Sequence, residues 1–343
     1  MAKKICILSI DGGGIRGILP GTIMVHIENL LQEKTKNKEA RLADYFDMIS
    51  GTSTGGILTC AYLIPDANGR PKLSAQQAVD LYLKKGESIF SLPLKQKLKS
   101  LFGIAQEKYS AQNLTNALQN SFENAMLDQL VKPCLITSYN IQSRHGFFMG
   151  KQRAQAKPDT HNFPAWHAAL ATASAPTFFE PALLKDSQGN RYPLVDGGVF
   201  ANNPAMCAYS EARTMNFDGK MNKPTAKDMF IISLGTGTNE KPYAYGKVKK
   251  WGVAQWIRPI VNIMMSGVAD TTDYHLKQIF ETLGEEHVNE YNRIEPELEN
   301  AKPDMDEATP ENMNNLQAAG NNYVTKNKDQ INTIVDKLIA YNS

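Results

Sequence analysis

Short apolar runs alternate with longer amphipathic stretches along the first 240 residues. The short runs are rich in β-branched and aromatic residues and several end in glycine or aspartate, as buried strands do. They predict strands at 3–10, 45–50, 133–140, 145–150, 192–198 and 229–237. Apolar positions at helical spacing predict helices at 17–34, 55–64, 163–175 and 203–215. Alternating strands and helices predict the α/β class, with a mostly parallel central sheet flanked by helices.

Outside this alternation the pattern is mostly helical. Residues 66–131 have helical spacing with polar and basic faces, and we expect them to form an insertion between sheet strands. Residues 250–343 predict a helical tail. Within it, residues 285–311 are acid-rich and interrupted by prolines, and we expect them to form surface loops with short helices. We find no internal repeat and no low-complexity linker, so we expect one domain over 1–343 with its motifs in 5–240.

One glycine-rich turn, "GTSTG", joins a predicted strand to a predicted helix and places Ser53 between Gly51 and Gly55. In this context G-x-S-x-G indicates a nucleophile elbow, a tight strained turn from which the serine hydroxyl projects. The glycines remove side chains that would collide with the neighbouring backbone, and the following helix favours negative charge at the serine. An ordinary β–α turn with a capping serine is the alternative.

The other glycine-rich turn is "DGGGIRG", residues 11–17, which fits G-x-G-x-x-G. A dinucleotide site would also need an acidic residue closing a second strand about 20 residues later, where this chain predicts a helix. A phosphate-binding P-loop would need a Lys-Ser or Lys-Thr pair, which this turn lacks. We therefore interpret the turn as an anion cradle at a helix start, which beside Ser53 would form an oxyanion hole.

A serine nucleophile needs a base, and the chain has six histidines. The chain order of an α/β-hydrolase would require His275 or His287, neither of which follows an obvious strand. Asp196 is the better candidate, because it ends a predicted strand in an apolar surround and precedes Gly197 and Gly198. An ordinary aspartate, with a pKa of about 3.9, would have to rely on geometry and desolvation. A turn-forming Asp-Gly remains the alternative.

The three motifs "DGGGIRG", "GTSTGG" and "DGG" in this order resemble the patatin-like phospholipase family. Longer segments such as "ATASAPTFFEPALL" and "LVDGGVFANNPA" are also similar, and the tail looks most like the plant patatins. The resemblance covers nearly the whole chain. It implies a Ser–Asp dyad, with Ser53 as the nucleophile and Asp196 as the base. It also implies an oxyanion hole in the glycine run and a basic loop residue that braces the loop or meets a lipid head group; the candidates are Gly12, Gly13, Gly14 and Arg16, with the amides of Gly13 and Gly14 favoured.

The resemblance implies a calcium-independent hydrolase of fatty-acyl esters of membrane lipids, with an acyl-serine intermediate and neither cofactor nor metal. The partners implied are a lipid ester and, transiently, a membrane or micelle surface. An acyltransferase or thioesterase would use the same dyad with a different acceptor. From a different class, a non-catalytic anion- or nucleotide-binding module and a silent lipid-binding protein remain as alternatives.

Composition narrows these classes a little further. With 37 basic and 35 acidic residues the net charge is +2, which argues against nucleic-acid binding through bulk charge. The four cysteines have no metal-ligand spacing, and we expect reduced, buried thiols in a reducing compartment. Without a signal-peptide pattern or an apolar spanning stretch, we expect a soluble protein that is cytoplasmic or peripheral at membranes, with signal-independent secretion left open.

Two amphipathic stretches have a composition that suits a lipid surface. Residues 92–103 place leucines on one helical face and lysines elsewhere, as an interfacial helix or an ordinary packed helix does. Residues 247–260 combine Trp251 and Trp256 with basic residues and are expected either to rim a lipid-facing mouth or to form a buried helix with lysines reaching solvent.

Overall fold

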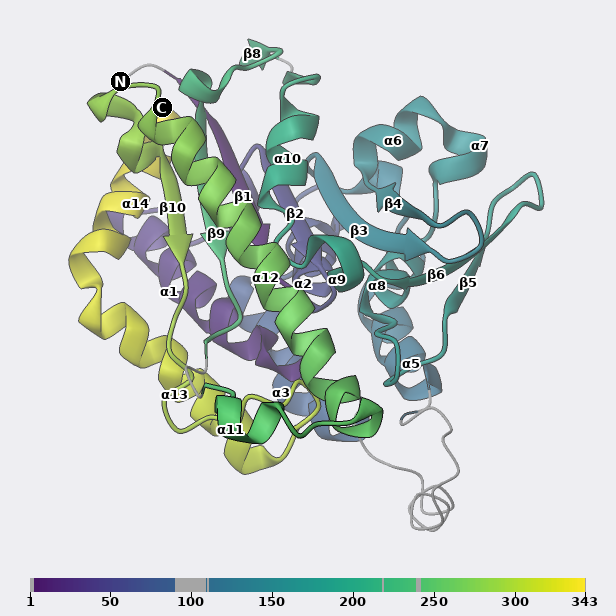
Figure 1. The fold of residues 1–343 in the computed structure, drawn as a ribbon. Helices are drawn as coiled ribbons and strands as arrows, with labels where there is room; N and C mark the ends of the chain where they lie inside the picture. Colours follow the sequence, from purple (N-terminus) through teal and green to yellow (C-terminus); the bar gives the residue numbers. More distant parts are fainter. Residues whose placement is uncertain (1–2, 90–108, 110, 218, 239–241, 343) are drawn as a thin grey trace.

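The computed structural model describes residues 3–89, 109, 111–217, 219–238 and 242–342. Its centre is an eight-stranded sheet in the order β10-β9-β1-β2-β3-β6-β5, with β4 paired to β3 (Figure 1). The five strands from β10 to β3 are parallel, β4 and β6 are antiparallel to β3, and β5 is antiparallel to β6. The strands are β1 (Ile5–Ile10), β2 (Met48–Thr52), β3 (Cys134–Asn140), β4 (His145–Met149), β5 (Ala182–Lys185), β6 (Arg191–Asp196), β9 (Met229–Leu234) and β10 (Tyr291–Ile294). The predicted α/β fold with a mostly parallel central sheet is confirmed.

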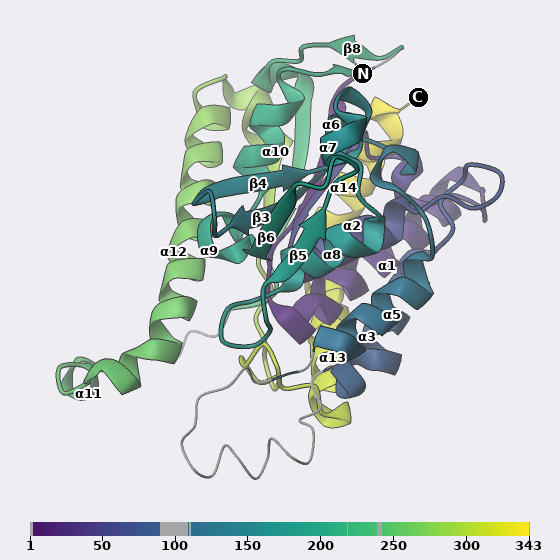
Figure 2. The same cartoon turned by 90° about the vertical axis from the view of Figure 1, so that its right-hand side faces the viewer.

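Helices cover both faces of this sheet (Figures 1 and 2). One face is covered by α1 (Ile18–Thr35), α2 (Thr54–Leu63), α3 (Ala75–Ile89), α5 (Ala111–Phe122), α8 (Ala165–Ala173), α13 (Pro310–Lys326) and α14 (Lys328–Tyr341). The other is covered by α10 (Ala205–Ala212) and α12 (Val253–Glu281). Shorter elements are α6 (Lys151–Ala156), α7 (Pro158–His161), α9 (Gly198–Ala201), α11 (Tyr245–Val248) and the hairpin β7 (Asn216–Phe217) with β8 (Met221–Asn222).

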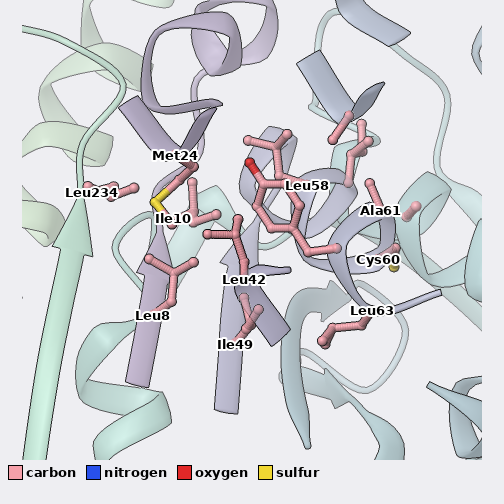
Figure 3. Packing of buried hydrophobic residues seen from close by; sticks show 14 of the residues in the cluster. Leu8, Ile10, Met24, Leu42, Ile49, Leu58, Cys60, Ala61, Leu63 and Leu234 are labelled. Atoms are coloured by element: carbon pink, nitrogen blue, oxygen red, sulfur yellow. The ribbon is translucent and has the colours of Figure 1, made fainter. Parts of the chain in front are cut away.

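The central strand β1 supplies apolar side chains to both layers. Cys6, Leu8 and Ile10 belong to the larger core cluster, while Ile5 and Ile7 face α10 and α12 in the smaller one. This alternation follows from the two-residue period of a strand, and it explains why an unbroken apolar run predicts a strand buried on both faces. Figure 3 shows the larger cluster from close by, with strand side chains lying against those of α1 and α2.

The helical stretch expected at 66–131 contains α3, α5 and a short 3-10 turn at Leu127–Gln129, and α3 and α5 pack on α1 and α8 respectively. Its amphipathic segment 92–103 lies outside the described residues. The expectation of loops with short helices at 285–311 is wrong in one respect, because this stretch contains β10. Two of the four β10 residues are polar and only partly buried, so no apolar run marks the strand. Pairing with β9 creates it.

No helix in the described part of the chain is both long enough and apolar enough to cross a bilayer.

Candidate active site

Ser53 alone makes the turn between β2 and α2. Its backbone has φ 55° and ψ −121°, a conformation that residues other than glycine rarely adopt. Its N–H donates to the Thr172 hydroxyl over 2.8 Å, so a side chain on α8 helps to hold the strained turn. The residue is 6% exposed, which places its hydroxyl in a largely enclosed surround.

The two elbow glycines are required by backbone packing. A Cβ on Gly51 would lie 2.0 Å from the carbonyl oxygen of Gly55, inside the turn itself. A Cβ on Gly55 would lie 2.1 Å from the carbonyl oxygen of Ile10, on the neighbouring strand β1. Neither oxygen can move aside, because each belongs to the backbone of the sheet or the turn. The elbow therefore depends on close backbone contacts inside the turn and between the turn and the neighbouring strand β1.

Asp196 ends the strand β6, as predicted, and the direction of this strand explains how the residue reaches Ser53. The strand β6 is antiparallel to β3, so Asp196 is not at the carboxyl edge of a parallel strand. Instead, the register pairs Asp196 with Ser138 on β3, while Thr52 on β2 pairs with Thr137. Because β4 occupies the other edge of β3 over residues 136–140, β2 and β6 lie end to end along the same edge. Their carboxyl ends meet there, so that Asp196 lies beside Ser53 and its carboxylate is in hydrogen-bonding contact with the Ser53 hydroxyl.

The Asp196 carboxyl has the electrostatics of a base that works near neutral pH. Burial raises its pKa to about 7, and hydrogen bonds from the Ser53 hydroxyl and the Gly198 N–H work against that rise. The Gly198 bond to Oδ1 is 2.7 Å long. Both partners are neutral, so the carboxylate is stabilised by dipoles only. Above pH 7 it is mostly ionised and can accept a proton from the serine.

An apolar cavity of about 140 Å³ adjoins the pair. Its wall contains Ser53 and Asp196 together with aliphatic, aromatic and methionine side chains, among them Ile57, Tyr82, Leu114, Phe179 and Met265. All six histidines are among the described residues, and none of them lines this cavity. The site thus joins a serine and a carboxyl to a space suited to a hydrocarbon chain.

The glycine loop lies beside the elbow. The Gly12 N–H donates to the Asn202 carbonyl over 3.1 Å, and the Gly12 carbonyl accepts from the Thr236 hydroxyl over 2.9 Å. Gly14 has φ 59°, and a Cβ there would lie 2.2 Å from the Met305 carbonyl oxygen. Gly14 also lines the Ser53 cavity. The amide of Gly12 is thus used within the fold, whereas Gly14 faces the place where a substrate would bind.

The start of this loop is held by a buried ion pair from the sheet edge. Arg293 on β10 donates to both carboxylate oxygens of Asp11, over 3.1 and 2.8 Å, and to the Ser233 hydroxyl over 2.9 Å. It also contacts the Glu295 carboxylate. The side chains of Arg293 and Asp11 are 10% and 3% exposed. Burial works against the charge on Arg293, but the two carboxylates raise its pKa above the ordinary value.

Arg16 continues this bracing. Its Nε donates to the Gly13 carbonyl over 3.4 Å, and one terminal nitrogen donates to the Gly237 carbonyl over 3.3 Å. The Gly237 N–H in turn donates to Glu295 over 3.2 Å. Arg16 faces a second cavity of about 980 Å³, whose wall is partly polar and partly apolar, and does not line the Ser53 cavity. Its contacts are those of a brace, and contact with a lipid head group stays a prediction.

Sequence reasoning missed the residues that support the site from a distance. Thr172 lies 119 positions from Ser53, and Arg293 lies 282 positions from Asp11. Neither belongs to a glycine motif, and the polar pair Asn292 and Arg293 gives no strand signal. Thr172 lies in the segment "ATASAPTFFEPALL", and Arg293 is a basic residue in an acid-rich stretch, three positions before Pro296. Neither signal is strong enough to assign a partner.

In the part of the chain that the structure describes, no group of three or more His, Cys, Asp or Glu side chains is placed to hold a metal ion. The four cysteines are free; Cys6, Cys60 and Cys134 are buried and Cys207 is partly buried. The expectation of reduced thiols agrees with this arrangement.

Comparison with known proteins adds independent information. A family model described as "Patatin-like phospholipase" matches residues 8–209. "Patatin-like protein 1" of Arabidopsis thaliana is 37% identical, over 96% of this chain and 83% of its own length. "Patatin-T5" of Solanum tuberosum is 34% identical, over 97% of this chain and 86% of its own. "Probable inactive patatin-3-Kuras 1" of the same plant is 32% identical, over 97% of this chain and 89% of its own length.

Proposed function

The chain belongs to the patatin-like phospholipase family, and from this premise we propose that it cleaves fatty-acyl esters of membrane lipids through a Ser53–Asp196 dyad, without calcium. Membership supports lipid acyl hydrolysis at the level of the family. The observation that carries the finer proposal is the contact between Ser53, strained at φ 55°, and a carboxyl whose pKa is about 7. An apolar cavity at the same point would accept the acyl chain.

In the first step, Asp196 accepts the proton of Ser53 as the serine oxygen attacks the ester carbonyl. The N–H groups of Gly13 and Gly14 stabilise the oxyanion, since the N–H of Gly12 is bonded to Asn202. Removing one such donor typically lowers the rate about 100- to 1000-fold. The tetrahedral intermediate then collapses, the alcohol takes the proton from Asp196 and leaves, and an acyl-serine remains.

In the second step, a water molecule replaces the alcohol. Asp196 accepts a proton from this water as its oxygen attacks the acyl-serine carbonyl, and the same amides stabilise the second oxyanion. Collapse returns the proton to Ser53 and releases the fatty acid. A carboxyl with a pKa near neutral can serve as base and then as acid in both steps, which a fully exposed aspartate would do poorly.

An acyltransferase or thioesterase would share this chemistry up to the acyl-serine and differ only in the acceptor or leaving group. Product analysis with lysolipid or alcohol present separates these outcomes, because transfer yields a new ester whereas hydrolysis yields free acid. The nucleotide-binding alternative is not supported, since the family model covers both glycine turns.

Activity has to be tested directly, because one relative is named as probably inactive. The test is fatty-acid release from phospholipid, galactolipid and monoacyl ester substrates, with a chelator present to remove calcium. Wild type is compared with Ser53→Ala and Asp196→Asn. We expect activity in wild type and a loss of roughly 1000-fold or more in each variant. Full activity in Ser53→Ala would disprove the dyad. If wild type is inactive, labelling of Ser53 by a fluorophosphonate shows whether the serine is nucleophilic.

A further inference from the structure

Exposed apolar side chains gather on a segment that ends at Met264, a lining residue of the Ser53 cavity. Of the large hydrophobic residues that are exposed in the described structure, six lie between residues 243 and 264, in α11, α12 and the segment before them. Tyr245 and Val253 are 80% and 83% exposed. Monomeric proteins rarely expose so many large apolar groups together, and such patches mark surfaces that bind something.

The first half of α12 presents these groups in an ordered way. Val253, Ile260 and Met264 follow one another at i, i+7 and i+11, which places them on one line along the helix. All three are exposed. Val261 and Met265, about a quarter turn away, line the Ser53 cavity instead. The helix therefore turns one apolar stripe toward the cavity and a second, neighbouring stripe toward solvent.

The mouth of the cavity opens beside this second stripe. Three of the residues that line the cavity are exposed and therefore mark its opening: Pro176, Val199 and Met264. Met264 belongs both to the opening and to the outer stripe of α12. An acyl chain entering the cavity must pass this edge of α12.

The same segment is basic and lacks acidic residues. Between residues 241 and 269 the sequence contains no aspartate or glutamate. Lys247, Lys249 and Lys250 are all exposed, on and just after α11. Trp251 and Trp256 lie next to them and stack edge to face, with ring centroids 5.2 Å apart. Segments that combine lysines, tryptophans and an apolar stripe typically bind at the interface of an anionic bilayer.

We propose that residues 243–264, called here the α11–α12 surface, dock the protein on an anionic lipid bilayer with the mouth of the cavity facing the membrane. Figure 2 shows α11 and the first turns of α12 standing away from the sheet, so that a flat surface can reach them. The lysines contact lipid head groups, and the tryptophans and the outer stripe of α12 enter the interface. The relevance of this surface to catalysis rests on the proposed function, but docking itself does not.

The test measures binding to vesicles by sedimentation and by the blue shift of tryptophan fluorescence, in a Ser53→Ala background that leaves the lipid intact. The vesicles are phosphatidylcholine alone or with about a third phosphatidylglycerol. The variant Lys247→Gln/Lys249→Gln/Lys250→Gln is compared with Lys38→Gln/Lys227→Gln/Lys328→Gln, which removes the same charge from exposed lysines elsewhere. We expect the first variant to bind anionic vesicles roughly 100-fold more weakly than the parent and the second to bind nearly unchanged.

A second variant, Tyr245→Ser/Val253→Ser, tests the apolar part and should weaken binding to both kinds of vesicle about tenfold. Equal binding by the two lysine variants, or no binding by the parent, would overturn the proposal. So would a dimer in sedimentation velocity that the Tyr245→Ser/Val253→Ser variant loses, since the surface would then bind a second copy. Hydrolysis of a water-soluble short-chain ester by chains with intact Ser53 tests the dyad separately: the lysine variant should keep the wild-type rate there.

Discussion

The two glycine-rich turns lie side by side, because β1 and β2 are neighbours with Ile10 opposite Gly51, yet they are held in different ways. The elbow at Ser53 is fixed mostly by backbone packing, of Gly51 on Gly55 inside the turn and of Gly55 on Ile10 of the neighbouring strand. The glycine loop is fixed from outside, by the buried ion pair between Arg293 on β10 and Asp11, the residue that follows β1. Both turns could therefore be inferred from their glycine motifs, whereas the distant ion pair that holds the second turn could not.

The largest effect should come from removing the outside support of the glycine loop. Arg293→Met leaves the Asp11 and Glu295 carboxylates without their common cation. Breaking a buried ion pair from one side typically lowers the free energy of unfolding by about 3–5 kcal/mol. Urea denaturation at pH 8 measures this loss.

A matched variant separates charge from packing in this experiment. The double variant Arg293→Met/Asp11→Asn removes one of the two stranded charges and should recover part of the stability. If Arg293→Met alone costs less than about 1 kcal/mol, the ion pair does not support the loop in the way we describe.

The next effect should come from inside the elbow. Gly51→Ala places a methyl group 2.0 Å from a backbone oxygen and should lower the free energy of unfolding by about 3 kcal/mol. Gly267→Ala is the control, because no atom lies within 4 Å of its added Cβ and it lies inside α12. The free energy of unfolding of that control should increase by up to about 1 kcal/mol, because alanine has a higher helix propensity than glycine. Similar thermal melts for the two variants would contradict the packing argument.

A smaller, pH-dependent effect should mark the base. The folded pKa of Asp196, about 7, lies above its ordinary value of 3.8, so the folded chain holds the proton more tightly than the unfolded chain. The stability that this group contributes is full below pH 4 and is lost as the pH rises through 7. The Asp196→Asn variant has no such loss. As the pH rises from 5 to 8, the free energy of unfolding of this variant should therefore increase by about 2 kcal/mol relative to that of wild type, as measured by urea denaturation. A constant difference would mean that Asp196 titrates normally.

The smallest effect should come from the strain in the elbow. Ser53→Gly relieves the unfavourable φ of 55°, whereas Ser53→Ala keeps it. The glycine variant should be more stable than the alanine variant by about 1 kcal/mol, after allowing for the greater freedom of glycine in the unfolded chain. Differential scanning calorimetry on the two variants, neither of which has a nucleophile, measures this difference. A more stable alanine variant would show that the turn is not strained.

Much of this architecture could be predicted from sequence, because it follows from local patterns. The apolar run at β1 and the strand–turn–helix context of Ser53 predict their structures with no knowledge of other segments. The prediction that Asp196 ends a strand in an apolar surround is confirmed. The sequence marks it as the end of a strand, but only the sheet register shows that β6 runs antiparallel and brings Asp196 beside Ser53.

Two further features depend on tertiary structure alone. The strand β10 forms because β9 offers it a partner, and Arg293 has a binding role only after that pairing brings it to Asp11. The raised pKa of Asp196 is likewise a consequence of burial by segments far apart in the chain. The apolar neighbours of Asp196 in the sequence pointed to desolvation, but its extent depends on distant segments, so the pKa itself could not be predicted.

The central claim is that a buried carboxyl with a pKa near neutral activates Ser53. The most direct measurement is the rate at which a fluorophosphonate labels Ser53 between pH 5 and 9, followed by intact mass. For wild type, the account predicts a rate that rises with pH and levels off above about pH 7. For Asp196→Asn, it predicts a rate at least about 100-fold lower with no step near pH 7. The claim would be contradicted if the wild-type rate does not change across pH 7, or if Asp196→Asn is labelled as fast as wild type.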